Sequence, residues 1–225
     1  MTEDGRQYKL AVMSLTINES RVRQVLDEMH AQADYVDPPL LRRAEGKTGA
    51  ERAAMLSEAF IPVDREAGRL LYALVRNSRP GMTVEFGTSY GISTLYMAAA
   101  IKDRGDGSVI TTEINEAKAQ RALQYFAQAD LLDYIDLRLG DAREMLDGLE
   151  RDISVVFLDG MKDLYLPVLQ ALEPSLQSGA LVIGDDIDLF PRPLEEYLDY
   201  VRDPANGYVS VSIPIGDGME LSVRE

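Results

Sequence analysis

The sequence predicts an α/β fold in which helices pack against a mostly parallel sheet that ends in an antiparallel hairpin. From Gly81 onward, short apolar runs alternate with segments of helical periodicity, which is typical of βαβ units. The turn Gly216-Asp-Gly218 separates two further strand patterns and indicates the hairpin. Residues 1–80 show helical patterns instead.

These first 80 residues are expected to form a helical cap on the sheet. One helix is expected after Asn18, its candidate N-cap, and another after Asp64. The apolar positions at helical spacing are Val22, Val25, Leu26 and Met29 in the first, and Leu70, Leu71, Leu74 and Val75 in the second. Between them, Leu40 to Phe60 is a less regular segment because it contains two glycines around Lys47 and Thr48.

The expected sheet has seven strands, five parallel and two in the hairpin. The strands are Met82–Phe86, Ser108–Thr112, Ile135–Leu139, Ile153–Leu158, Ala180–Ile183, Tyr208–Ile213 and Met219–Val223. Helical patterns at Ile92–Lys102 and Glu116–Gln128 connect the first three strands. Since no repeat or linker interrupts the chain, we expect one domain over 1–225, with a cap at 1–80 and an α/β core at 81–225.

Composition excludes several classes of function. The 23 Lys and Arg against 38 Asp and Glu give a formal charge of −15, which would repel nucleic acid and anionic lipid, so we expect neither as a partner. The absence of cysteine excludes disulfides, thiolate metal sites and a cysteine nucleophile. No apolar run is long enough to span a membrane and the start is polar, so a cytoplasmic location is expected.

A glycine-containing loop closes the first expected strand and opens the next helix. The segment runs Glu85-Phe-Gly-Thr-Ser-Tyr-Gly91 and includes Thr88 and Ser89. Gly87 and Gly91 allow the backbone to approach a ligand that the helix N-terminus faces. The loop is not the G-x-G-x-x-G of dinucleotide folds, and a turn without a ligand remains an alternative.

Acids at the next two strand ends favour an adenosyl ligand. Glu113 follows the second glycine by 113 − 91 = 22 residues, where a carboxylate can accept both ribose hydroxyls. Asp141 can accept an exocyclic amine, and Ala142 leaves room for a flat ring. Each acid alone could instead be a solvated strand end or a helix cap.

Three further acids and a lysine follow the fourth and fifth strands. Asp159 ends the fourth strand, Lys162 follows it by three residues, and Asp185 and Asp186 end the fifth. Three hard oxygen ligands suit Mg²⁺. The alternatives are that the two adjacent acids cap a loop and that the lysine pairs with Asp163 at the surface.

These motifs together resemble the class I methyltransferases, and more narrowly the cation-dependent O-methyltransferases of the catechol and caffeoyl-coenzyme A type. The resemblance runs from about Ile61 to the C-terminus. Its most specific segments are Phe157-Leu-Asp-Gly-Met-Lys-Asp-Leu-Tyr-Leu-Pro167 and Gly184-Asp-Asp-Ile187. It implies a Rossmann-like methyltransferase fold and S-adenosylmethionine as the cofactor.

The resemblance also implies a role for each site residue. It places Glu85 and the glycines beside the methionine end, with Ser93 at its carboxylate and Val63 covering it. It assigns Glu113 to the ribose and the Asp141-Ala142 pair to adenine. The cofactor-binding residues that we expect are Val63, Glu85, Gly87, Thr88, Ser89, Gly91, Ser93, Glu113, Ile114, Asp141, Ala142 and Asp159.

The expected reaction is methylation of one hydroxyl of a small catechol-like diol. A phenol with a pKa of about 10 is mostly protonated at neutral pH, and a cation held by Asp159, Asp185 and Asp186 would lower that pKa. Lys162 is the expected general base, provided that its own pKa is depressed beside the cation. Family members usually carry asparagine at the Asp186 position, so the added charge bears on the affinity for the metal and on metal choice. They carry bulkier residues at Gly160-Met161, so strict catechol specificity is not implied.

Three other functions remain open: a metal-independent O- or N-methyltransferase, an NAD-dependent oxidoreductase, and a binding module without turnover. The acceptor walls are expected from the N-terminal helices and the loop after Asp186, with Leu40 to Ile61 as the candidate lid. A homodimer is expected by analogy with the family. His30, the only histidine, is expected to be structural, as are the helix residues Tyr197 and Tyr200.

Overall fold

The computed structural model describes residues 14–33, 51, 55, 60, 62–149 and 152–225. Within these ranges, one sheet of seven strands has the order β3-β2-β1-β4-β5-β7-β6. The strands are β1 Met82–Phe86, β2 Val109–Glu113, β3 Ile135–Leu139, β4 Ile153–Leu158, β5 Leu176–Gly184, β6 Tyr208–Ile213 and β7 Met219–Arg224. The first five are parallel and the last two antiparallel, which confirms the predicted sheet and hairpin.

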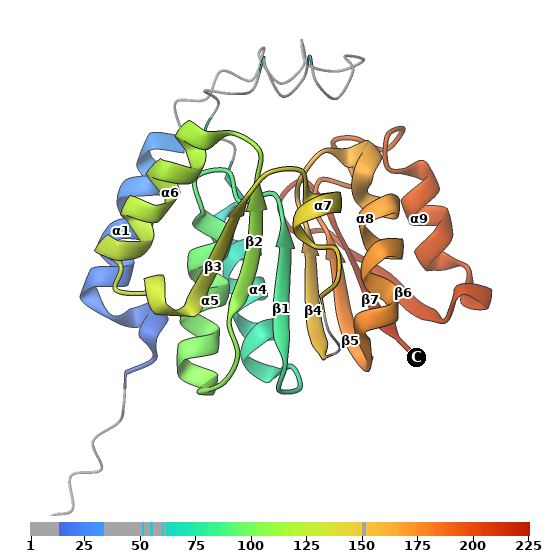
Figure 1. Ribbon diagram of the computed structural model, residues 1–225, viewed down its shortest axis with the longest axis horizontal. Coiled ribbons are helices and arrows are strands. Elements are labelled where there is room, and N and C mark those ends of the chain that lie inside the picture. The colour runs from blue at the N-terminus through green and yellow to red at the C-terminus, as the bar shows by residue number, and fades with distance from the viewer. Residues whose placement is uncertain (1–13, 34–50, 52–54, 56–59, 61, 150–151) are drawn as a thin grey trace, which may run out of the picture.

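Helices cover both faces of this sheet (Figure 1). They are α1 Ser20–Ala33, α4 Arg65–Asn77, α5 Ile92–Arg104, α6 Glu116–Gln128, α7 Ala142–Met145, α8 Tyr165–Leu172 and α9 Glu195–Arg202. The apolar residues of α1, α4, α5 and α6 form one buried cluster, and those of α7, α8 and α9 form a second on the other face. No helix in the described ranges is long and apolar enough to cross a membrane.

Of the two N-caps that the sequence predicted, the structure confirms one and contradicts the other. Asp64 caps α4 as predicted, because its carboxylate accepts a hydrogen bond from the Ala67 amide at 2.7 Å. The Asn18 prediction is wrong: Asn18 ends a 3₁₀ turn at Thr16–Asn18, and α1 begins only at Ser20. The Thr16 amide and hydroxyl instead bond the Asp103 carboxylate, which ties this turn to α5.

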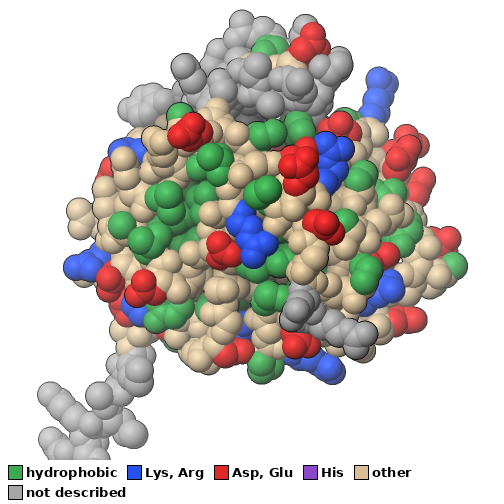
Figure 2. All heavy atoms as spheres, viewed as in Figure 1, with side chains coloured by type: hydrophobic (Ala, Val, Ile, Leu, Met, Phe, Trp, Pro, Cys, Tyr) green, Lys and Arg blue, Asp and Glu red, His purple; other side chains and the backbone are tan. Residues whose placement is uncertain are grey.

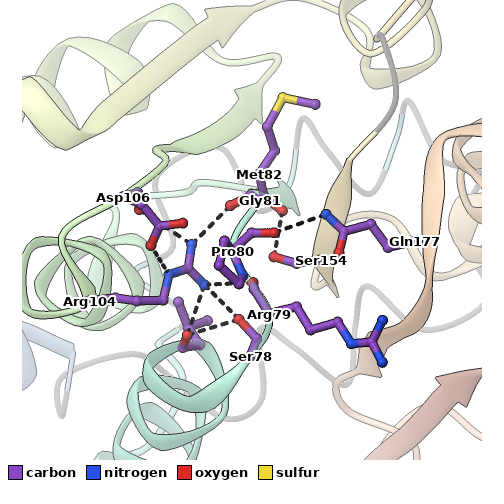
Figure 3. Close-up of polar contacts among 10 residues, drawn as sticks. Ser78, Arg79, Pro80, Gly81, Met82, Arg104, Asp106, Ser154 and Gln177 are labelled. Atoms are coloured by element: carbon purple, nitrogen blue, oxygen red, sulfur yellow. Dashed lines mark hydrogen bonds and ion pairs between the residues drawn. The ribbon is translucent and has the colours of Figure 1, made fainter.

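Arg104, at the C-terminus of α5, holds together the loops at the amino end of β1, opposite the strand ends that carry the site. Its guanidinium donates to the Val75 and Gly81 carbonyls at 3.0 and 2.9 Å and to Ser78 Oγ at 2.6 Å (Figure 3). It also pairs with Asp106 at 2.6 Å. One side chain thus ties the loop that enters β1 to the loop that leaves α5, and so fixes β1 relative to its neighbours.

The chain reverses its direction across the sheet between β1 and β4. Connections run outward from β1 through β2 to β3, and the chain then returns to β4 on the other side of β1. In such sheets the crevice beyond the carboxyl ends of these two strands is the usual ligand site. The fold therefore directs attention to the residues after Phe86 and Leu158.

Acidic side chains are spread over the face shown in Figure 2 rather than gathered in one place. Hydrophobic side chains gather left of centre, on the side of the sheet where β3 lies. Leu132 and Leu139 are exposed in that part of the chain, at 43% and 47%. The acidic charge on this face therefore has the distribution of a solvated surface.

Candidate active site

A cavity of about 200 Å³ opens at the carboxyl ends of the central strands. Nine of the predicted site residues line it: Gly87, Ser89, Glu113, Ile114, Asp141, Ala142, Asp159, Lys162 and Asp186. A smaller hollow beside it is lined by Val63, Thr88, Gly91 and Ser93. Ser89 and Asp159 border both hollows, so the two are neighbours. Glu85 and Asp185 line neither of them.

Gly87 brings the ends of β1 and β4 into contact. Its φ is +103°, and a Cβ at this position would lie 2.7 Å from both the Asp159 carbonyl oxygen and the Gly160 amide nitrogen. The Asp159 amide donates to the Phe86 carbonyl at 2.9 Å. Only glycine fits this conformation and this approach, and the fit keeps the glycine loop against the Asp159 loop.

Glu113 closes the glycine loop from β2. One carboxylate oxygen accepts the Ser89 amide at 2.7 Å, and the other accepts the Asn115 amide at 2.8 Å. A carboxylate oxygen can accept two hydrogen bonds, so each retains capacity for a ligand hydroxyl. Glu113 is 9% exposed and lines the cavity, so this capacity faces the space where a ligand would lie.

Glu85 lies behind the loop rather than in the cavity wall. It is fully buried, and its carboxylate accepts hydrogen bonds from Ser93 and Thr94 at 2.5 Å and from Thr111 at 2.6 Å. Burial raises its pKa to about 7, and these hydroxyl bonds oppose the shift. In the structure Glu85 and Ser93 bond each other, and of the two only Ser93 lines a hollow, the smaller one. Their contact with a ligand stays a prediction.

Thr88 and Asp141 also have internal partners. The Thr88 hydroxyl bonds that of Thr111 at 2.5 Å and turns toward the sheet. Asp141 caps α7 by accepting the Arg143 amide at 2.9 Å, and it pairs with the Arg143 guanidinium at 2.6 Å. Hydrogen bonds from Arg143 lower the pKa of Asp141. Asp141 is thus the helix cap that the sequence left open as an alternative, while it also lines the cavity.

Lys162 lies among the acids of β4 and β5. Its ammonium is 3.1 Å from Asp159 Oδ1 and 2.7 Å from Asp186 Oδ2, and it donates to the Tyr165 hydroxyl at 2.7 Å. The side chain is 6% exposed, so the alternative of a surface pair with Asp163 is wrong. Asp186 has a left-handed backbone conformation, with a φ of 64°, and its carboxylate contacts the lysine.

The charges in this group shift one another's pKa. Burial raises the pKa of Asp159 to about 6, and the nearby Lys162 ammonium opposes this shift. Burial also raises the pKa of Asp185 well above its usual value, as do the neighbouring carboxylates. For Lys162, burial lowers the pKa, but attraction to Asp186, Asp159 and Asp185 raises it well above its usual value. The protein's own carboxylates therefore shift the lysine pKa in the direction opposite to the depression that was expected beside a cation.

The acids have the chemistry of a metal site without a preformed cage. All three offer hard carboxylate oxygens, and their ionised charges exceed that of the single lysine by two. In the described ranges no three His, Cys, Asp or Glu side chains converge on a common point. The donor set thus fits a divalent cation in charge and in ligand type, but the described side chains are not arranged around a common point.

Sequence reasoning missed several residues of the cavity. Lys118 on α6 lines it, as do the apolar side chains of Leu164, Leu189 and Phe190. Phe60 stacks on Tyr90 beside the smaller hollow, with ring centroids 4.4 Å apart. Helical spacing carried a signal for Lys118, because it lies four residues before the buried Ala122. The rest of the Leu40 to Ile61 lid lies outside the described residues, apart from Glu51 and Met55.

The residues expected to be structural have that role. His30 is 6% exposed and lies 3.4 Å from the Tyr96 hydroxyl in the core. Tyr197 is fully buried against Tyr165, and the Tyr200 hydroxyl donates to Glu173 at 3.0 Å. None of these three lines the cavity or the smaller hollow.

Comparison with known proteins identifies the family. A family described as "Methyltransferase domain" matches residues 84–187. The chain is 30% identical to caffeoyl-CoA O-methyltransferase 1 of Eucalyptus globulus, over 71% of this chain and 73% of that protein. It is 26% identical to mouse catechol O-methyltransferase, over 95% of this chain and 82% of that protein.

A solved structure shares the fold. The O-methyltransferase from Bacillus cereus in complex with SAH matches with a TM-score of 0.61 and 19% identity, over 90% of this chain and 99% of that chain. The glycine loop and the acidic ends of β4 and β5 are the parts of the fold on which the sequence resemblance depended. The chain belongs to the cation-dependent O-methyltransferases of the catechol and caffeoyl-CoA type, which are S-adenosylmethionine-dependent enzymes.

Proposed function

We propose that this enzyme methylates one hydroxyl of a small acceptor with two adjacent hydroxyls, such as a catechol. Asp159, Asp185 and Asp186 would hold a divalent cation, and Lys162 would accept the acceptor's proton. The observation that carries the proposal is the position of Lys162: its ammonium is buried in the cavity wall, between Asp159 at 3.1 Å and Asp186 at 2.7 Å.

The cavity supports a cofactor position that extends across the glycine loop. Glu113 would accept the ribose hydroxyls with its free lone pairs, since each of its oxygens bonds only one amide. Ala142 and Ile114 would border adenine, and Asp141 would meet its exocyclic amine. The methionine end would lie toward the smaller hollow, where Val63 and Ser93 are found.

The acceptor would lie on the other side of Asp159. Leu164, Leu189 and Phe190 give this part of the cavity apolar walls, which suit a flat aromatic ring. Mouse catechol O-methyltransferase and the eucalyptus caffeoyl-CoA enzyme are named for acceptors of this kind. A small phenolic acceptor with vicinal hydroxyls is therefore the substrate class that we propose.

Lys162 must be neutral before it can accept a proton. Three carboxylates hold it in the charged form, with its pKa well above the usual value. A bound divalent cation would offset these carboxylate charges, and it would also lower the pKa of an acceptor hydroxyl. Tyr165, which accepts a hydrogen bond from Lys162 at 2.7 Å, would keep the amine directed into the site.

The test is methyl transfer to a catechol panel, with and without EDTA, and with Mg²⁺ added back. We expect chelation to abolish transfer and Mg²⁺ to restore it. Asp185→Asn is expected to lower kcat/KM at least about 100-fold through the metal. Asp163→Asn, at an exposed position beside Lys162, is the matched control and should change little. Full activity under chelation would refute the metal assignment.

One observation favours a second candidate, a metal-independent methyltransferase. Lys162 itself pairs with both Asp159 and Asp186, so it already offsets part of the charge that a cation would offset. In that case Lys162→Met would remove activity, whereas EDTA would not. Binding of S-adenosylhomocysteine is expected under both candidates, so it tests the cofactor separately from the metal.

A further inference from the structure

Three buried aromatic side chains, Phe86, Tyr165 and Tyr197, form a row beside the two acidic strand ends. Phe86 ends β1, Tyr165 begins α8 and Tyr197 lies in α9, and all three are buried. The Phe86 and Tyr165 rings meet edge to face with their centroids 6.3 Å apart, and the Tyr165 and Tyr197 rings do so at 5.5 Å. This aromatic row lies on the face of the sheet where α8 and α9 run side by side (Figure 1).

Each end of the aromatic row lies against a glycine that adjoins the proposed metal ligands. A Cβ at Gly160, which follows the acid of β4, would overlap the tip of the Phe86 ring. A Cβ at Gly184, which precedes the acids of β5, would lie 2.8 Å from Cε1 of Tyr197. Neither glycine has a positive φ, so the approach of a ring, rather than the backbone conformation, favours glycine at both positions.

The middle ring of the row joins the two strand ends directly. The Tyr165 hydroxyl accepts a hydrogen bond from Lys162 at 2.7 Å and donates one to the Asp185 carbonyl at 3.3 Å. It therefore contacts the loop after β4 and the residue after β5 at once. Tyr197 and Gly184 line neither the cavity nor the smaller hollow, so they can influence a ligand only through the residues that they support.

We propose that the aromatic row is a positioning element, which sets the distance between the acid of β4 and those of β5 and hence the affinity of the site for a divalent cation. The inference rests on the proposed function, in which these acids hold the cation. The paired residues of β4 and β5 end at Leu158 and Gly184, so the acids lie beyond the last pair. Because protein interiors are close-packed, a change in Tyr197 is transmitted to the strand end that it touches.

Titration with Mn²⁺, followed by its EPR signal, measures this affinity without turnover, and Mn²⁺ prefers the same oxygen ligands as Mg²⁺. Tyr197→Leu and Gly184→Ala are each expected to weaken Mn²⁺ binding about 10-fold, the usual effect of losing a group that orients metal ligands. The affinity for S-adenosylhomocysteine should stay unchanged. The double variant should bind Mn²⁺ more tightly than Gly184→Ala alone, because leucine leaves room for the added methyl group. Tyr197→Phe keeps the ring and should keep the wild-type affinity.

Controls separate this role from a purely structural one. Tyr125→Leu makes the same substitution at a fully buried tyrosine in the other core cluster, and it should lower stability without changing Mn²⁺ affinity. Tyr197→Met provides a more adaptable side chain if the leucine variant does not fold. Unchanged Mn²⁺ affinity in the Tyr197 and Gly184 variants, or no gain on combining them, would overturn the positioning role. A wild type that binds S-adenosylhomocysteine but no Mn²⁺ would instead overturn the proposed metal site, and this inference with it.

Discussion

Replacing Glu85 by glutamine is expected to stabilise the protein at neutral pH and above. The Glu85 carboxyl is fully buried, and three hydroxyls surround it, those of Ser93, Thr94 and Thr111. Glutamine has the same shape as the protonated acid, and hydroxyls can turn to accept as well as donate. The substitution therefore removes the cost of a buried charge while it retains the surrounding contacts.

The size of this effect follows from the pKa of Glu85, which burial raises from 4.5 to about 7. A raised carboxyl pKa stabilises the folded state below the unfolded pKa, and this stability is lost as the pH rises through the folded pKa. Since one pKa unit corresponds to about 1.4 kcal/mol, the loss is about 1 kcal/mol at about pH 5.5 and about 3 kcal/mol at about pH 8. The stability of Glu85→Gln relative to the wild type should therefore rise by about 2 kcal/mol between these conditions.

Urea unfolding of both proteins at the two pH values measures this difference. Glu220→Gln is the matched control, because Glu220 is also buried but pairs with Arg202 at 2.7 Å. Burial raises its pKa, but hydrogen bonds from Arg202, Ser210 and Ser212 outweigh burial and lower it. Its replacement should therefore cost more stability at the higher pH. A Glu85→Gln difference that stays constant with pH, or falls as pH rises, would refute the reasoning.

Three further substitutions test the rest of the structure. Gly87→Ala should lower both the melting temperature and the rate of methyl transfer, because its Cβ would lie 2.7 Å from the Asp159 carbonyl oxygen. Gly148→Ala is the control: it is also at positive φ but in open space, so it should lower the unfolding free energy by only about 1 kcal/mol. Lys162→Met should lower the single-turnover rate about 10²- to 10⁴-fold with little change in cofactor affinity, and a smaller loss would exclude it as the base. Arg104→Met should lower the urea-unfolding free energy by about 3 kcal/mol and leave S-adenosylhomocysteine affinity unchanged.

Much of the sheet could be predicted because its strands are short apolar runs between glycines and acids. The predicted β1, β3 and β4 agree with the structure residue for residue. β5 is longer than predicted and begins at Leu176, because Gln177 and Ser178 interrupt the apolar pattern without interrupting the strand. Asn18 failed as a helix cap because the Thr16 turn is stabilised by Asp103, a partner 87 residues away that no local pattern reveals.

The site was predicted in position but not in detail. The sequence predicted that Gly87, Glu113 and Asp159 lie near one another, because parallel strands have their carboxyl ends at one edge of the sheet. Side-chain direction could not be predicted in this way, and Glu85 turned out to bond three hydroxyls instead of facing the cavity. Family membership decides against the NAD-dependent alternative. The single domain, the dimer and the cytoplasmic location remain predictions.

The carboxylates around Lys162 carry more charge than the lysine can balance, which bears on whether the site binds a metal. Asp159, Asp185 and Asp186 carry two more negative charges, when ionised, than Lys162 can match. An unmatched buried charge costs free energy, and the raised pKa values of Asp159 and Asp185 are the signs of that cost. Proteins retain such costs mainly where a ligand or a reaction uses them. The lysine that lies between two of these acids offsets part of this charge, and under the proposed function a cation would offset the rest.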